Sequence, residues 1–291
     1  MDKTRLALIQ VAWTGSAEGM MEQYHQLGAQ ARQLGAQLVL LPEFSLLPYF
    51  PATRDLQGFQ YAEPLRGGLS ETFFSGLARE NGFAVIGSLY ERAEDGSYYD
   101  TATLHDSEGR FVGFTRKVHI PSGEGYHETD FFVGAQEYPV HLLAGLKLGA
   151  PTCYDQWFPE LARIYALEGA ELLAYPTAIG GEPNAPHFDS RDAWQTVMRG
   201  HAVANGLFVA ACNRVGTERV TFYGSSFICD PLGRILAQAS RDQAEVIVAD
   251  LDPAVLDEMR ELFPLLHQRR TSAYGRLLEG AVRASKPDWL A

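Results

Sequence analysis

The chain has 291 residues, of which 46% are hydrophobic, and a formal net charge of −12 at pH 7. This length and apolar content support a sizeable core, in one large α/β domain or two ordinary ones. The negative charge argues against a nucleic acid or an anionic membrane as partner and is compatible with a cationic ligand. The cysteines Cys153, Cys212 and Cys229 show no CxxC spacing, so we expect no disulfide framework, no metal site and no cofactor.

The N-terminus leads directly into a predicted strand. The apolar run at residues 6–11 is too short for a secretory signal peptide, and no segment approaches the length of a membrane span. We therefore predict a cytoplasmic protein without a membrane partner.

The first half of the chain alternates predicted strands and helices. Apolar runs at residues 6–11 and 38–41 are typical of strands buried on both faces, and residues 20–34 between them have helical character. Residues 44–67 are loop-like and aromatic, and a helix capped by Ser70 is expected to end at Gly82. Three strand patterns joined by turn signals then predict an antiparallel meander, at residues 83–90, 98–105 and 110–117.

The second half continues this alternation. Residues 140–150 have the pattern of a single buried strand, and helices are predicted from Pro159, from Ser190 and at residues 253–263. Further strands are predicted at residues 171–175, 207–212, 221–229, 235–238 and 244–251. No linker or low-complexity segment divides the chain, so we predict one domain covering residues 1–291, with two mixed sheets and helices outside.

Three ionisable side chains directly follow predicted buried strands: Glu43, Lys117 and Cys153. Taken alone, each has a plainer explanation as an exposed loop carboxylate, a surface lysine or a packed cysteine. Together they suit nucleophilic catalysis, because a carboxylate can take the proton of a thiol and an ammonium can stabilise an oxyanion. Cys153 is predicted at an exposed turn between a strand and a helix, where backbone N–H groups and the helix dipole favour the thiolate.

Three segments resemble the signatures of the nitrilase superfamily of carbon–nitrogen hydrolases, and they follow one another in the order of that family. The resemblance implies a four-layer αββα sandwich in which Glu43 is the general base, Lys117 supports the tetrahedral intermediate and Cys153 is the nucleophile. It also implies that Glu128 positions the substrate and that the backbone N–H of Tyr154 completes the oxyanion site. The segments are Leu-Pro-Glu-Phe at 41–44, Arg-Lys-Val-His-Ile-Pro at 116–121 and Thr-Cys-Tyr-Asp-Gln-Trp-Phe-Pro-Glu at 152–160.

Within the superfamily, residues 153–160, 175–182, 189–192 and 221–224 resemble the N-carbamoylputrescine amidases. This resemblance implies a thiol amidohydrolase of polyamine biosynthesis that converts N-carbamoylputrescine, or a similar carbamoylated amine, to the amine, CO2 and ammonia through a covalent cysteine intermediate. It also implies a homo-oligomer, a dimer or higher, with the tail at about 265–291 in contacts between copies. The chain departs from the family at Pro151, where a small aliphatic residue is usual, and in the shorter stretch at 213–221.

Other functions stay open at this point. The same triad could act on a nitrile, another ω-amide or an N-carbamoyl amino acid. A silent partner-binding module of the same fold would have no physical reason to keep Glu43, Lys117 and Cys153. A papain-like Cys–His hydrolase lacks its cysteine signature near the N-terminus.

A substrate with a cation at its far end would need carboxylates or aromatic faces in the pocket. The loop after residue 175 offers Glu182 and Asp189, and the aromatic loop offers Tyr49. Trp157 either lines the pocket or packs beneath a helix. A carbamoyl amino acid would instead need an arginine, for which Arg191 is the nearest candidate, although two aspartates flank it.

Overall fold

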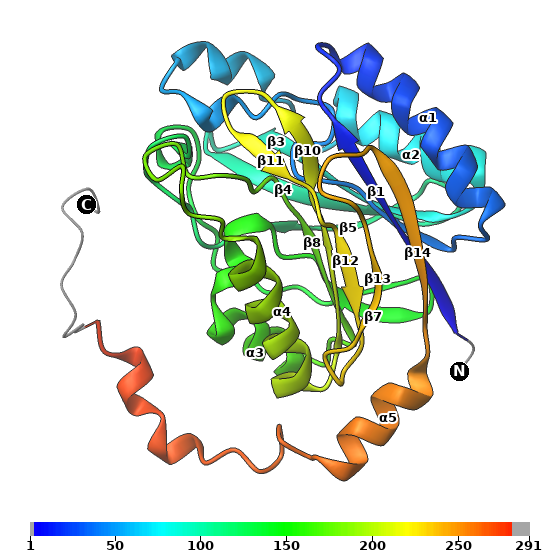
Figure 1. The fold of residues 1–291 in the computed structure, drawn as a ribbon, viewed down its shortest axis with the longest axis vertical. Coiled ribbons are helices and arrows are strands. Elements are labelled where there is room, and N and C mark those ends of the chain that lie inside the picture. Colours follow the sequence, from blue (N-terminus) through cyan, green and yellow to red (C-terminus); the bar gives the residue numbers. More distant parts are fainter. Residues whose placement is uncertain (1–2, 281–291) are drawn as a thin grey trace.

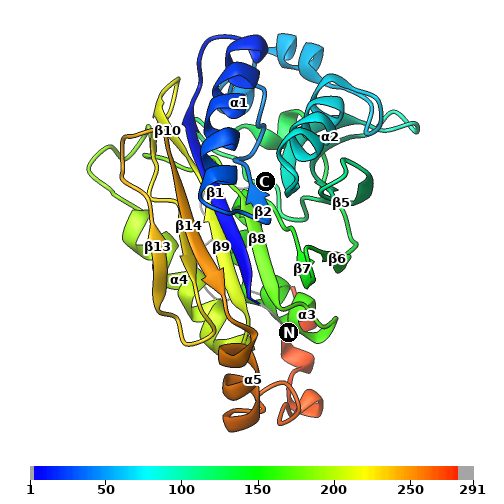
Figure 2. The same ribbon diagram turned by 90° about the vertical axis from the view of Figure 1, so that its right-hand side faces the viewer.

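The structure is a computed structural model, and it describes residues 3–280. Two β-sheets pack face to face (Figures 1 and 2). The first sheet has eight strands, in the order β11-β10-β1-β2-β3-β4-β5 with β14 also paired to β1. Their bounds are β1 (Thr4–Ala12), β2 (Leu38–Leu40), β3 (Ala84–Arg92), β4 (Tyr98–His105), β5 (Phe111–Arg116), β10 (Arg214–Thr217), β11 (Thr221–Tyr223) and β14 (Glu245–Leu251).

The second sheet has six strands in the order β13-β12-β9-β8-β7-β6. Between the sheets lies a core of fully buried aliphatic and aromatic side chains, which includes Leu8, Leu40, Leu172 and Phe208. The strands are β6 (His141–Leu143), β7 (Leu146–Gly149), β8 (Leu172–Pro176), β9 (Phe208–Cys212), β12 (Phe227–Cys229) and β13 (Ile235–Gln238).

Helices cover the outer faces of both sheets. Helices α1 (Ala17–Gln33) and α2 (Leu69–Asn81) pack on the first sheet, and α3 (Pro159–Leu167) and α4 (Arg191–Asn205) pack on the second (Figure 1). Because both faces of each central strand are covered, these strands read as continuous apolar runs. The arrangement confirms the predicted four-layer αββα sandwich.

Two strand predictions are wrong. Residues 140–150 form a hairpin, since Ala144 (φ 50°) and Gly145 (φ 80°) both adopt the positive φ of a two-residue turn between β6 and β7. Residues 221–229 form two strands in different sheets, because the chain crosses from the first sheet to the second between Tyr223 and Phe227. The preceding strand β10, which the sequence analysis missed, joins the first sheet beside β1.

The C-terminal part of the described chain extends away from the sandwich after α5 (Pro253–Leu262), as Figure 1 shows in orange and red. Leu277 and Leu278 are exposed on it. The contact of this segment with a neighbouring copy stays a prediction, and residues 281–291 of the predicted tail lie outside the described part. Among residues 3–280, no helix combines the length and apolar character that a bilayer crossing requires.

Candidate active site

The loop after β2 places Glu43 in a tight turn that ties the two sheets together. The Glu43 backbone N–H donates to the carbonyl of Thr177, which follows β8 in the opposite sheet, at 3.3 Å. Phe44 adopts φ 48°, a left-handed conformation unusual for a bulky residue, and its N–H donates to Ser88 Oγ at 3.0 Å. Such strain persists only where the surrounding structure enforces it, and it is typical of functional sites.

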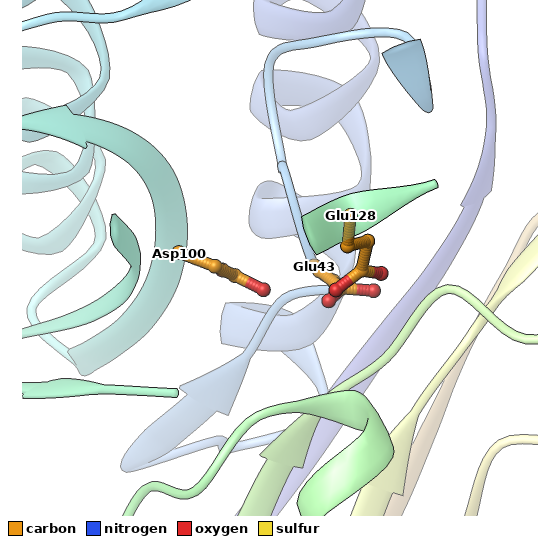
Figure 3. Close-up of side chains that lie close together, drawn as sticks. All are labelled: Glu43, Asp100 and Glu128. Carbon is orange, nitrogen blue, oxygen red and sulfur yellow. The ribbon is translucent and has the colours of Figure 1, made fainter. Parts of the chain in front are cut away.

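Lys117 lies at the centre of three carboxyl groups. Its Nζ is 2.8 Å from Glu43 Oε1, 2.5 Å from Glu128 Oε2 and 3.3 Å from Asp100 Oδ2, and all four side chains are completely buried. Figure 3 shows the three carboxyl side chains, which come from β4, from the loop after β2 and from the short helix Glu128–Asp130. The fold therefore brings four ionisable groups from distant segments of the chain into one enclosed cluster.

The charges of this cluster shift one another's protonation. Burial raises the pKa of Glu43 well above its ordinary value; Lys117 opposes this shift, and Asp100 and Glu128 add to it. Burial also raises the pKa of Glu128, against the attraction of Lys117. Burial alone would lower the pKa of Lys117, but Glu128 and Glu43 outweigh it and raise that pKa, so the ammonium stays charged. A buried carboxyl with a raised pKa suits a general base.

The three carboxyl groups also have the donor chemistry of a metal site. Their oxygens lie within 4.8 Å of one another, and such oxygens are the preferred ligands of hard cations. The ammonium of Lys117, however, lies against all three. A divalent ion would have to displace this fully buried ammonium from its carboxylate partners, so these residues do not fit a metal.

Cys153 begins the short helix Cys153–Trp157 with φ 44°. The tight turn is as expected, but the expected exposure is wrong, because Cys153 is only 6% exposed and its Sγ lies 3.8 Å from the carbonyl oxygen of Ala178. The expected ionisation is wrong too. Burial and the nearby Glu43 raise the pKa of the thiol, which outweighs the lowering effect of Lys117. The long helix α3 starts only at Pro159, beyond the first-turn range of its dipole.

Glu43 has one carboxyl oxygen that is not engaged by Lys117. Its Oε2 is buried and has no hydrogen-bond partner among the described residues. The backbone N–H of Tyr154, the second residue of the short helix, has no acceptor within that helix. That N–H and the Lys117 ammonium, whose charge lowers the pKa of the thiol, are donors of the kind that an oxyanion site uses.

Asp155 joins the segment after Lys117 to the turn of Cys153. Its Oδ1 accepts from the His119 backbone N–H and from His119 Nδ1, each at 2.8 Å. Its Oδ2 accepts from the backbone N–H groups of Val118 and Thr152, each at 3.2 Å. The carboxylate is fully buried, so these charge-assisted bonds hold the segment after Lys117 and the turn of Cys153 in one arrangement.

Glu128 and Tyr49 form a supporting pair. The Tyr49 hydroxyl donates to Glu128 Oε1 at 2.6 Å, and the ring is 2% exposed among Phe44, Tyr126 and Phe222. Tyr49 therefore orients Glu128, and its buried ring does not offer the open aromatic face expected for a cation.

A cavity of about 390 Å³ is lined by Arg54, Ser122, Glu124, Tyr126, His127 and Glu182, among others. Its lining reaches the cluster through His127, the chain neighbour of Glu128, and does not include Cys153. Glu182 is half-buried, burial raises its pKa, and it makes no ion pair with a described residue. The charges of both Glu182 and Cys153 raise the pKa values of three tyrosines, Tyr126, Tyr154 and Tyr223, although burial is the largest cause for each. Glu182 and Cys153 are thus both within electrostatic reach of these three tyrosines.

Other predicted substrate residues lie apart from this cavity. Asp189 is exposed, with 54% of its side chain accessible, and pairs with Arg241 at 2.9 Å. Trp157 packs half-buried against the core beneath α3 and α4. Arg191 pairs with Asp192.

Two residues near the site, Asp100 and Arg54, were not predicted from the sequence. The bridging role of Asp155 was not predicted either. Asp100 carried a usable signal, because aspartate is depleted in strands and this one interrupts the predicted strand at residues 98–105. Asp155 lies within a recognised motif, but its partners come from another segment. Arg54 in the aromatic loop carried no signal.

Comparison with known proteins agrees with this geometry. The sequence profile of the carbon–nitrogen hydrolase family matches residues 5–261. The chain is 36% identical to a citrullinase of Francisella tularensis over 284 residues, 96% of this chain and 99% of the relative. It is 37% identical to the N-carbamoylputrescine amidase of Solanum tuberosum over 290 residues, 95% of this chain and 96% of the relative.

A solved structure gives the same result. The crystal structure of a carbon–nitrogen hydrolase from Helicobacter pylori G27 is similar with a TM-score of 0.91 and 36% identity, over 96% of this chain and all of that one. The fold, the enclosed cluster and these similarities lead to one conclusion: the chain belongs to the carbon–nitrogen hydrolases of the nitrilase superfamily and is a hydrolase that acts on amides.

Proposed function

We propose that this enzyme removes the carbamoyl group from a carbamoylated amine whose far end is cationic, with N-carbamoylputrescine as the preferred substrate. The observation that carries this proposal is Glu182, a half-buried carboxylate without an ion pair among the described residues, in a cavity that it shares with Tyr126 and with His127, the chain neighbour of Glu128. A partly desolvated carboxylate is a strong partner for an ammonium group. The similarity to the potato N-carbamoylputrescine amidase supports the same substrate.

The first half of the reaction forms a covalent intermediate. Glu43 takes the proton of the Cys153 thiol as the sulfur adds to the carbonyl carbon of the ureido group. The carbonyl oxygen becomes an oxyanion, which the Lys117 ammonium and the Tyr154 backbone N–H stabilise. Glu43 then returns the proton to the terminal nitrogen, the carbon–nitrogen bond breaks, and ammonia leaves an alkylcarbamoyl thioester on Cys153.

The second half regenerates the enzyme. Water adds to the thioester carbonyl while Glu43 accepts one of its protons, and the carbon–sulfur bond then breaks as that proton returns to the sulfur. The released carbamic acid separates into the amine and CO2. Glu128 positions Lys117, whose Nζ lies 2.5 Å from Glu128 Oε2, and is itself fixed by the hydroxyl of Tyr49.

Citrulline is the second candidate, and one observation favours it. Arg54 lines the same cavity as Glu182. Citrulline carries a carboxylate beside its ammonium group, so an arginine and a glutamate together would match both charges. The relative from Francisella is named a citrullinase.

The test is kcat/KM for ammonia release from N-carbamoylputrescine, citrulline and N-carbamoyl-β-alanine, with variants Glu182→Gln and Arg54→Gln. Loss of one ion pair in a partly desolvated pocket should cost at least about 1.4 kcal/mol, so Glu182→Gln should lower kcat/KM for N-carbamoylputrescine at least about tenfold. Arg54→Gln should leave this substrate unaffected and weaken citrulline turnover. Asp189→Asn is the matched control, because it neutralises an exposed carboxylate of the same loop.

Two results would contradict the proposal. Preference for the anionic N-carbamoyl-β-alanine would refute the cationic substrate. Equal loss in Glu182→Gln and Asp189→Asn would show that Glu182 acts only through the general charge of the loop.

A further inference from the structure

Asp100 is a fully buried carboxyl group that the reaction above does not use. It lies on β4 opposite Tyr90, and its backbone carbonyl accepts the N–H of Lys117 at 2.9 Å. Its Oδ1 accepts from Ser88 Oγ at 3.2 Å. Its Oδ2 lies 3.3 Å from Lys117 Nζ but has no hydrogen-bond partner among the described residues. The side chain is therefore fixed beside the catalytic lysine with one oxygen unsatisfied.

The groups around Asp100 carry more negative than positive charge. The loop after β2 contributes Glu43, the end of β5 contributes Lys117, and the short helix at 128–130 contributes Glu128. The Cys153 thiol of the short helix at 153–157 is within electrostatic reach of Glu43, Lys117 and Glu128, and burial is the largest cause of its raised pKa. Three carboxyl groups thus face one ammonium in an enclosed site, where like charges disfavour full ionisation.

Hydrogen bonding indicates which carboxyl groups bind an incoming proton. Glu128 already accepts from Lys117 Nζ and from the Tyr49 hydroxyl, so its ionised form is satisfied. Glu43 Oε2 and Asp100 Oδ2 are the carboxyl oxygens of this cluster that lack a partner. The two carboxyl groups each have an oxygen within 4.8 Å of the other, so a proton taken up by this pair would provide a donor where both oxygens now lack one. Buried polar groups are costly when left unpaired.

We propose that Asp100 is a positioning residue for the base: Glu43 and Asp100 act as a carboxyl pair that takes up the thiol proton of Cys153 together. Before attack the Lys117 ammonium, which lies against both groups, favours their ionised forms, and the repulsion between the carboxylates favours the uptake of one proton. The S–H bond breaks, the proton moves to the pair, and it is later delivered to the departing ammonia, so no external donor is needed. Asp100 also raises the pKa of Glu43, after the larger effect of burial, which agrees with this role. The inference rests on the proposed role of Glu43 as base.

The test is the Asp100→Asn variant, which keeps the shape of the side chain and removes its charge. Without a neighbouring carboxylate the pKa of Glu43 falls, so the acid limb of the pH profile should move about 1–3 pH units lower. The plateau rate should also fall, because a weaker base takes the thiol proton less readily. Glu91→Gln is the matched control, since Glu91 is a buried carboxylate of the adjacent strand that pairs with Arg116, and its acid limb should not move.

Two readouts separate this inference from the choice of substrate. Ammonia release from N-carbamoylputrescine measures the full reaction, whereas the pH dependence of Cys153 alkylation by iodoacetamide needs no substrate. If the enzyme releases no ammonia from N-carbamoylputrescine, the proposed substrate is wrong. The pH dependence of Cys153 alkylation then still tests the role of Asp100. A slower Asp100→Asn enzyme with an unmoved acid limb would overturn the inference, because Asp100 would then only hold Lys117.

The wild-type enzyme provides an independent check if Asp100→Asn does not fold. The acid limb of its kcat/KM, which reports the ionisation of the base in the free enzyme, should lie well above about 4.3, the ordinary pKa of a glutamate. A midpoint at the ordinary value would refute the carboxyl pair without any variant.

Discussion

Asp155 offers a direct test of how the two catalytic segments are held together. The substitution Asp155→Asn keeps the size of the side chain but replaces one acceptor oxygen with an NH2 group. Whichever way the amide is oriented, two of the four N–H groups that now point at the carboxylate lose their acceptor.

The expected cost follows from these contacts. A hydrogen bond to a charged group contributes about 1.5–3 kcal/mol, so losing two should lower the free energy of unfolding by about 3 kcal/mol or more. Misplacing reacting groups by about 1 Å can cost about 10²-fold in rate, so kcat should fall on that order while KM changes less. The reason is that Asp155 touches neither the thiol nor Lys117 but fixes the backbone beside both.

Urea unfolding and steady-state kinetics should be measured on Asp155→Asn and on the control Asp230→Asn. Asp230 is also buried and accepts backbone N–H groups, from Leu232 at 3.0 Å and Arg234 at 2.9 Å, but in a turn between β12 and β13. The control should lose stability and keep kcat. Equal kcat values in the two variants would show that Asp155 affects the fold alone, and an Asp155→Asn enzyme as stable and active as wild type would refute the reasoning.

Further predictions concern the nucleophile, its partners and the effect of pH on stability. Cys153→Ala should abolish ammonia release with the fold intact, whereas Cys212→Ala should retain most activity; equal loss would contradict the assignment. Glu43→Gln and Lys117→Met should each lower kcat, by at least about 10²–10³ for Lys117, and a change in KM alone would mark them as binding contacts. Burial lowers the pKa of His105 from 6.5 to about 4, so the unfolded chain binds more protons than the native protein between these pH values. Acidification through this pH range should therefore lower the free energy of unfolding by up to about 3 kcal/mol, as measured by urea unfolding at several pH values. The His105→Leu variant should lack this loss of stability, and a variant as sensitive to acid as the wild type would refute the prediction.

Much of the architecture could be predicted from the sequence, because the central strands are short and apolar on both faces. Motifs directly after such strands also predicted Glu43, Lys117 and Cys153 as one set, since strand ends are where α/β folds bring polar groups together. In the structure, Lys117 Nζ lies 2.8 Å from Glu43 Oε1. The hairpin at residues 140–150 and the break at 224–226 were missed because neither run contains a strong turn signal such as Asn-Gly.

The protonation of the site could be decided only by the tertiary structure. The motif predicted an ionised, exposed thiol, but desolvation and the proximity of Glu43 depend on what packs around Cys153 from distant segments. Asp100 and Asp155 likewise acquire their roles from partners that are far away in the sequence. Sequence periodicity reports which face of an element is apolar, whereas the charge balance of a buried cluster depends on distances between elements, and those distances exist only in the folded chain.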